Sequence, residues 1–283
     1  MIWGASIAWY LFLAGASAGA FITSTYVQFK HPENVKVRLI GRIIAPIAVC
    51  VGLLLLMIDA EAGLHNPLRF VFLVMNPGSV MTLGVYLLCV YMPISFVVVL
   101  LELLHKDAPR WLAVVGCVFA AGVAMYTGFL LGVCASHPLW NSTILPILFL
   151  ASALSAGAAS VGLVALFVDR EAFERMVGLK RLHVFVVACE AVLLFAFLTL
   201  AASTSPEGAE SVGLLVGGTY SLAFWLGLVA AGLVLPLCVQ VFGLVRPDAP
   251  AALGVVGEVG ALVGGWLLRF LVIAAALPVV FVL

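Results

Sequence analysis

Charged side chains are scarce in this sequence. Lysine, arginine, aspartate and glutamate make up 9% of its 283 residues, whereas soluble domains carry about 25%. Hydrophobic residues make up 65%, and the mean hydropathy is +1.28. Because no soluble fold could cover so much apolar surface, the chain is expected to lie in a lipid membrane. The formal net charge is zero, and the absence of a basic tract or acidic tail argues against a nucleic-acid partner.

Familiar ligand patterns for metals are also missing. None of the six cysteines forms a CxxC pair, so we expect no zinc or iron–sulfur motif and treat the cysteines as small apolar side chains. A membrane cytochrome b needs histidines inside its helices at matched depth. The five histidines all fall in expected connections or at helix ends, so no haem is expected. They are His31, His65, His105, His137 and His183.

Long apolar runs predict an all-α integral membrane protein with eight transmembrane helices, because a span needs about 20 apolar residues. The first run is too long for a signal peptide and follows no positive segment, so we expect it to be retained. We expect no soluble domain. The predicted spans cover residues 4–29, 39–59, 79–104, 111–133, 143–168, 181–202, 212–244 and 251–282.

The basic residues predict the orientation of these spans. All lysines and arginines except Arg69 and Arg269 lie in or beside the odd-numbered connections. Positively charged connections face the cytoplasm. We therefore expect a multi-pass membrane protein with both termini outside.

A short string occurs twice. "YLFLAGASAGAF" (10–21) returns as "LFLASALSAGAAS" (148–160). Because four spans separate the copies, both run in the same direction, which predicts a parallel internal repeat of two four-helix bundles, 1–138 and 139–283. Gly15 and Gly19 form a GxxxG pair that allows close helix packing. Such a small-residue face can also leave room for a flat ligand.

Polar groups near the outer end of the first bundle are candidates for chemistry, because ionisable groups in a membrane are costly. Asp59 ends the second span and Glu61 follows it. Tyr126 and Thr127 bring hydroxyls to the fourth span, and Tyr10 enters the first span from the same side. Tyr10 could equally belong to the aromatic belt of the interface.

The second bundle carries ionisable residues at several depths, namely His183, Glu190, Glu258 and Arg269. They could form a proton pathway from the cytoplasm, or they could be structural ion pairs. An ion pair between Arg269 and Asp59 is a further alternative.

The even-numbered connections could dock a partner. Segment 60–79 is amphipathic and contains Arg69, and segments 135–143 and 203–211 lie on the same expected face. Segment 60–79 is either an interfacial segment or, with the other two, a docking surface for an extramembrane subunit.

Three stretches carry a resemblance to a known family. "YLFLAGASAGAF", "LLLLMIDAEAGLHNPLRF" and "YTGFLLGVCASHPLWNSTILPILFLASALSAGA" follow one another in the chain, and the whole sequence resembles the polysulfide reductase membrane-subunit (NrfD-like) family. The resemblance implies a bacterial or archaeal inner membrane, two four-helix bundles without haem, and a quinone site near the outer face of the first bundle. It also implies an iron–sulfur subunit above that site and a catalytic molybdopterin or multihaem subunit. Tyr126 matches the tyrosine expected at the quinone, and Asp59 matches the acid that closes the second span. The His or Asn often found on the first span has no counterpart in residues 3–10.

These observations predict a membrane anchor that exchanges electrons between menaquinone or ubiquinone and a partner iron–sulfur subunit. Tyr126, His65 and His137 would donate hydrogen bonds to the quinone, and Asp59 or Glu61 would pass its protons outward. A secondary transporter with a parallel repeat is the alternative, although it needs broken helices at matching sites and the prolines of the two halves do not align. The expected quinone-site residues are Tyr10, Gly15, Gly19, Asp59, His65, Arg69, Tyr126, Thr127 and His137, with Asp59, Glu61 and Tyr126 in the reaction itself.

Overall fold

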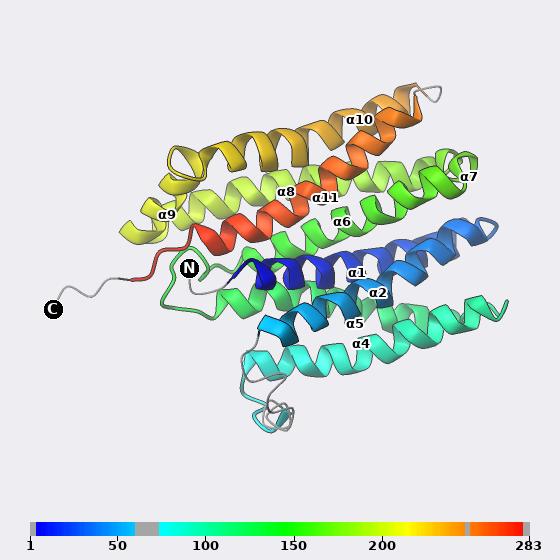
Figure 1. Cartoon of the computed structure of the whole chain (residues 1–283), viewed down its shortest axis with the longest axis horizontal. Helices are drawn as coiled ribbons and strands as arrows, with labels where there is room; N and C mark the ends of the chain where they lie inside the picture. Colours follow the sequence, from blue (N-terminus) through cyan, green and yellow to red (C-terminus); the bar gives the residue numbers. More distant parts are fainter. Residues whose placement is uncertain (1–3, 60–73, 247–249, 280–283) are drawn as a thin grey trace.

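The computed structural model describes residues 4–59, 74–246 and 250–279 (Figure 1). In these ranges, eight helices are long and apolar enough to cross a membrane, which confirms the predicted number. They are α1 (Ala5–Lys30), α2 (Val35–Asp59), α4 (Val80–Leu103), α5 (Arg110–Gly132), α6 (Leu145–Val168), α8 (Val177–Thr204), the continuous helix η1 (Ala223–Val234) plus α10 (Leu235–Val245), and α11 (Ala251–Ala274).

Two predicted boundaries differ from the structure by more than about five residues and are wrong. The seventh span begins at Ala223 rather than at 212, because residues 206–216 form a separate helix, α9 (Pro206–Val216). Ser205 caps α9 by accepting a hydrogen bond from the Gly208 amide, and the glycine pair at 217 and 218 follows its end, as the capping preferences of helices favour. The eighth span ends at Ala274 rather than at 282. Much of the predicted connection 203–211 is therefore helical.

Helices α1 and α6 cross at the centre of the molecule, with α2, α4 and α5 on one side and α8, α10 and α11 on the other (Figure 1). The two copies of the repeated string lie on these helices and meet at their crossing. A Cβ added to Gly19 would lie 1.9 Å from the Ala153 carbonyl oxygen, and one added to Gly157 would lie 2.1 Å from the Gly19 carbonyl carbon. The small residues thus allow backbone contact between the helices.

The ends of the bundle differ in charge. Connections 31–34, 104–109 and 169–176 lie together with the end of α10 and the start of α11 at one end, here called the basic end, because most of the lysines and arginines are in or beside these segments (Figure 1). The other end, here called the opposite end, holds the start of α1, the end of α2, connection 133–144 and α9 (Figure 1). The two ends correspond to the predicted cytoplasmic and outer sides, respectively.

Candidate functional site

Tyr126 lies near the opposite end on α5, where its ring packs on Gly84 of α4. Only 6% of Tyr126 is exposed. A Cβ added to Gly84 would lie 1.9 Å from Cζ of the tyrosine, so any larger residue at position 84 would displace the ring. The neighbouring Thr127 is fully buried and donates its hydroxyl to the Ala124 carbonyl at 2.7 Å. Gly84 was not among the sequence candidates, although it holds the Tyr126 ring in place.

Tyr10 of α1 is the second aromatic hydroxyl in this region. It is 2% exposed and packs near Gly52 of α2, and it interacts electrostatically with Tyr126. Within the described ranges, neither tyrosine hydroxyl makes a hydrogen bond. Two hydroxyls in this region are therefore available to a ligand that carries hydrogen-bond acceptors.

Asp59 lies at the last position of α2 and is exposed. Its carboxylate is near the start of α1, since a Cβ on Gly4 would lie 3.7 Å from Oδ1. The remaining candidates of this stretch, Glu61, His65 and Arg69, lie outside the described residues, as does most of the predicted docking segment 60–79.

His137 lies in the connection between α5 and α6. It is 6% exposed, stacks on Trp140 with ring centroids 4.3 Å apart, and its Nδ1 is 2.9 Å from the Ser136 hydroxyl. Burial lowers the pKa of His137 below its usual range, so the neutral form is favoured at pH 7. Trp140 donates its indole N–H to the Val272 carbonyl at 2.7 Å. These contacts anchor the predicted docking segment 135–143 to α11.

Gly15 and Gly19 have a packing role that differs from the predicted ligand slot. A Cβ on Gly15 would lie 2.6 Å from Nη2 of Arg269, so the guanidinium occupies the space beside this glycine. The space beside Gly19 is filled by α6, as described above. Both glycines are therefore left out of the quinone site proposed below.

Arg269 is fully buried where α1, α6 and α11 meet. Its guanidinium donates to the Leu11 carbonyl at 3.1 Å, the Gly265 carbonyl at 2.7 Å and the Ser152 hydroxyl at 3.0 Å. It also interacts electrostatically with Glu190 of α8, which is 3% exposed. The suggested ion pair of Arg269 with Asp59 is therefore wrong, because the arginine is held by partners inside the bundle.

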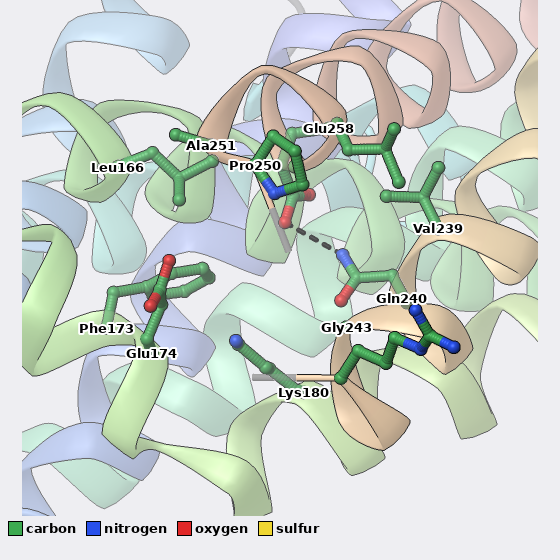
Figure 2. A pocket seen from close by; sticks show the side chains of 13 residues that line it. Leu166, Phe173, Glu174, Lys180, Val239, Gln240, Gly243, Pro250, Ala251 and Glu258 are labelled. Carbon is green, nitrogen blue, oxygen red and sulfur yellow. Dashed lines mark hydrogen bonds between the residues drawn. The ribbon is translucent and has the colours of Figure 1, made fainter. Parts of the chain in front are cut away.

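A second polar group lies beside a cavity near the basic end of the C-terminal half. The amide nitrogen of Gln240 donates to Glu258 Oε1 at 2.8 Å and lies 3.0 Å from Nδ1 of His183. The sequence predicted that His183 lies at the end of a span that begins at residue 181. In the structure α8 begins at Val177, so His183 lies deeper in its helix than predicted. The cavity holds about 50 Å³ and is lined by Glu258, Gln240 and Lys180 (Figure 2). This volume accommodates a few water molecules.

A third polar cluster was not foreseen from the sequence. Arg38 and Arg42 of α2 are almost fully buried and lie 3.3 and 3.5 Å from the carboxylate of Glu102 on α4. Arg42 also donates to the Gln28 side chain at 2.9 Å, and Arg38 donates to Asp107 at 2.7 Å. The available signal was Glu102, an acid inside a predicted span. The arginines had been assigned to the charged edge of a connection.

No group of three or more His, Cys, Asp or Glu side chains lies close enough to hold a metal ion in the part of the chain that the structure describes. The candidate groups that the structure places near the opposite end are the hydroxyls of Tyr10 and Tyr126 and the carboxylate of Asp59.

Comparison with known proteins agrees with this architecture. The family described as "Polysulphide reductase, NrfD" matches residues 1–281. A polysulfide reductase chain of Wolinella succinogenes is 37% identical over 268 residues, covering 85% of this chain and 83% of the relative. "Protein NrfD" of Escherichia coli is 31% identical, covering 97% of this chain and 95% of the relative. A selenate reductase subunit of Mesobacillus selenatarsenatis is 26% identical, covering 56% of this chain and 46% of the relative. The chain therefore belongs to the polysulphide reductase NrfD family.

Proposed function

We propose that this protein is the membrane anchor of a respiratory reductase complex, in which it exchanges electrons between the quinone pool and a partner iron–sulfur subunit at the opposite end. Two relatives are named as individual subunits of polysulfide reductase and selenate reductase, which supports a role as one subunit of such a complex. The partner would carry the iron–sulfur clusters, and a further subunit would carry the molybdopterin or multihaem centre. The opposite end would face the periplasm.

The pair of tyrosines Tyr10 and Tyr126, which are 2% and 6% exposed and whose hydroxyls make no hydrogen bond among the described residues, is the observation that carries this proposal. A quinone head has two carbonyl oxygens that accept hydrogen bonds, and a tyrosine hydroxyl can donate one. A quinone would satisfy the hydroxyls, while its isoprenoid tail would remain in lipid. Tyr126 would hold the head group from α5, and Gly84 would keep the Tyr126 ring in position.

Proton release would use the exposed carboxylate of Asp59. Oxidation of a quinol to a quinone releases two protons and two electrons. The protons would pass to Asp59 and then to water at the opposite end, because this carboxylate is exposed there. The electrons would leave to the partner's cluster. Connections 135–143 and 203–211, with segment 60–79, would form the surface on which the partner docks.

A transporter is less consistent with the geometry. A carrier built from repeats needs helices that are broken at matching sites in both halves. In the N-terminal half, α2 and α4 continue through Pro46 and Pro93 as single helices. The hydrogen-bonding site also lies near one end of the molecule, whereas carriers bind their cargo near the bilayer midplane.

The proposal is tested by binding a quinone to the purified chain in lipid nanodiscs. Infrared difference spectra with ¹³C-labelled menaquinone and ubiquinone analogues report on each quinone carbonyl. Hydrogen bonding from the tyrosines should shift at least one carbonyl band to lower frequency than that of the same quinone in empty nanodiscs. Bands identical to those of the free quinone would contradict the proposal.

The cavity beside Glu258 supports a second role, a proton pathway that begins at the basic end and includes His183, Glu190, Glu258 and Arg269. Glu258 is 2% exposed in the protein, yet it lines a cavity large enough for water (Figure 2). Buried carboxyl groups that meet water inside membranes commonly serve as proton carriers. The pathway would couple quinol oxidation to proton uptake at the basic end.

Glu258→Gln should therefore lower the number of protons moved per electron in sealed vesicles. The rate of quinol oxidation should change less than about twofold when the membrane is made proton-permeable, because Glu258 does not contact the quinone. Glu171→Gln is the matched control, since Glu171 is exposed at the basic end and does not line the cavity. A proton stoichiometry equal to that of the unmodified protein would leave the cluster with a structural role only.

A further inference from the structure

An apolar groove lies between α1 and α8, with α6 beneath it. It has a volume of about 240 Å³. Leu154 and Ala158 of α6 line its floor, and Ile22 of α1 and Val186 of α8 are on its two walls. Leu182 of α8 also lines it and is 41% exposed. The groove therefore opens to the surrounding membrane.

Tyr26 narrows the groove at the basic end. A Cβ added to Gly178 would lie 2.8 Å from the Tyr26 hydroxyl, so the glycine makes room for this hydroxyl at the start of α8. The tyrosine thus joins α1 to α8 near the basic end. Elsewhere both helices pack on α6 between them (Figure 1).

His183 brings an unpaired hydrogen-bond donor to this groove. The amide nitrogen of Gln240 is a donor, and Nδ1 of His183 lies 3.0 Å from it, so Nδ1 accepts and the imidazole proton is on Nε2. His183 lines the groove and is 4% exposed, and its Nε2 has no hydrogen-bond partner among the described residues. A buried N–H without a hydrogen-bond partner is costly in lipid. The occupant of the groove must therefore offer an acceptor as well as apolar surface.

The depth of His183 in the membrane limits which kind of molecule can occupy the groove. Lys180 and Arg181 precede it by three and two residues in α8, a rise of about 3–5 Å along the helix. Lys30, at the end of α1, is about 6 Å beyond Tyr26 by the same rise. Such basic residues mark the membrane interface. The donor therefore lies near the level of the ester groups of phospholipids, and the apolar walls continue from it toward the membrane interior.

We propose that the groove is a binding site for a glycerophospholipid of the leaflet at the basic end. An ester carbonyl accepts the Nε2–H of His183, and one acyl chain lies along Ile22, Leu154 and Val186. Lys30, one helical turn beyond Tyr26 on α1, is available to the phosphate. The site is independent of the tyrosine pair at the opposite end and does not rest on the proposed quinone reaction.

Photocrosslinking of the full chain in nanodiscs tests this site. The probe is phosphatidylglycerol with a diazirine on one acyl chain, and mass spectrometry locates the labelled peptides. Labels are expected within 22–26, 154–158 and 179–186. His183→Leu should reduce this labelling roughly fivefold, the effect of losing one ordinary hydrogen bond. Ala158→Phe should abolish it by filling the floor of the groove.

Val164→Phe is the matched control for Ala158→Phe, because Val164 is on the same helix but 37% exposed and outside the groove.

A second measurement, the infrared band of the lipid ester, reports on the hydrogen bond itself. The ester carbonyl band of retained lipid should be at lower frequency in the unmodified protein than in His183→Leu. Groove labelling that is equal in the unmodified protein and both variants would overturn the proposal. Preferential labelling of the groove by an azidoquinone over the phospholipid would overturn its assignment to lipid. Tyr126→Phe should leave the labelling unchanged, which separates this test from that of the quinone site.

Discussion

Tyr126→Phe is expected to slow quinol oxidation by the assembled complex about 100-fold. The phenylalanine ring can keep its packing on Gly84, so the variant loses only the hydroxyl. Removing one preorganised hydrogen-bond donor from a reaction site typically costs a factor of about 10²–10³ in rate. The measurement is steady-state turnover with menaquinol and ubiquinol analogues, using a complex purified with its native partners.

Tyr86→Phe is the control for this variant. Tyr86 is on α4, is 40% exposed, and donates its hydroxyl to the Val74 carbonyl at 2.8 Å. The same chemical change at this position should alter the turnover by less than about twofold. If Tyr126→Phe also turns over within twofold of the unmodified complex, the tyrosine does not hold the quinol.

Gly19→Val should have the largest effect on stability, because position 19 lies where α1 and α6 are in backbone contact. Even the first added carbon would lie 1.9 Å from the Ala153 carbonyl oxygen and 2.9 Å from the Gly157 Cα. Backbone atoms cannot move away as a flexible side chain would, so α1 and α6 must separate. Overpacking of this kind costs about 3 kcal/mol. This loss of stability should lower the midpoint temperature of thermal unfolding of the purified chain. Tryptophan fluorescence monitors the unfolding.

Gly213→Val provides a control for the change of residue type. A Cβ at Gly213 of α9 would meet no atom within 4 Å, so the unfolding midpoint should remain close to that of the unmodified chain. Equal midpoints for the two variants would show that the contact of α1 with α6 contributes little to stability.

The transmembrane helices were predictable because apolar length and the placement of charges are local properties of the sequence. The start of the seventh span was not, because residues 212–216 are as apolar as a span, and only the cap at Ser205 and the glycines at 217 and 218 separate α9 from it. The close packing of α1 and α6 followed from the repeated small residues. Whether the two halves are related as a parallel repeat remains a prediction.

The candidate site was only partly accessible to sequence reasoning. Tyr126 and Tyr10 could be selected by type and depth, but the role of Gly84 depends on a contact between α4 and α5 that no local pattern encodes. The space beside Gly15 looked free in the sequence, yet Arg269 fills it from the last helix. The ion pair of Arg42 with Glu102 depends on a contact between α2 and α4, and the orientation rule alone accounts for a basic residue at that end.

Single-turnover mixing of a quinol with the purified complex in sealed vesicles tests the central claim most directly. With the opposite end facing the medium, a menaquinol or ubiquinol analogue should reduce the partner's iron–sulfur cluster, and protons from the quinol should appear in the medium. Tyr126→Phe should slow the reduction of the cluster and the release of protons by the same factor. A cluster that no quinol reduces, or quinol protons released only at the basic end, would contradict the account.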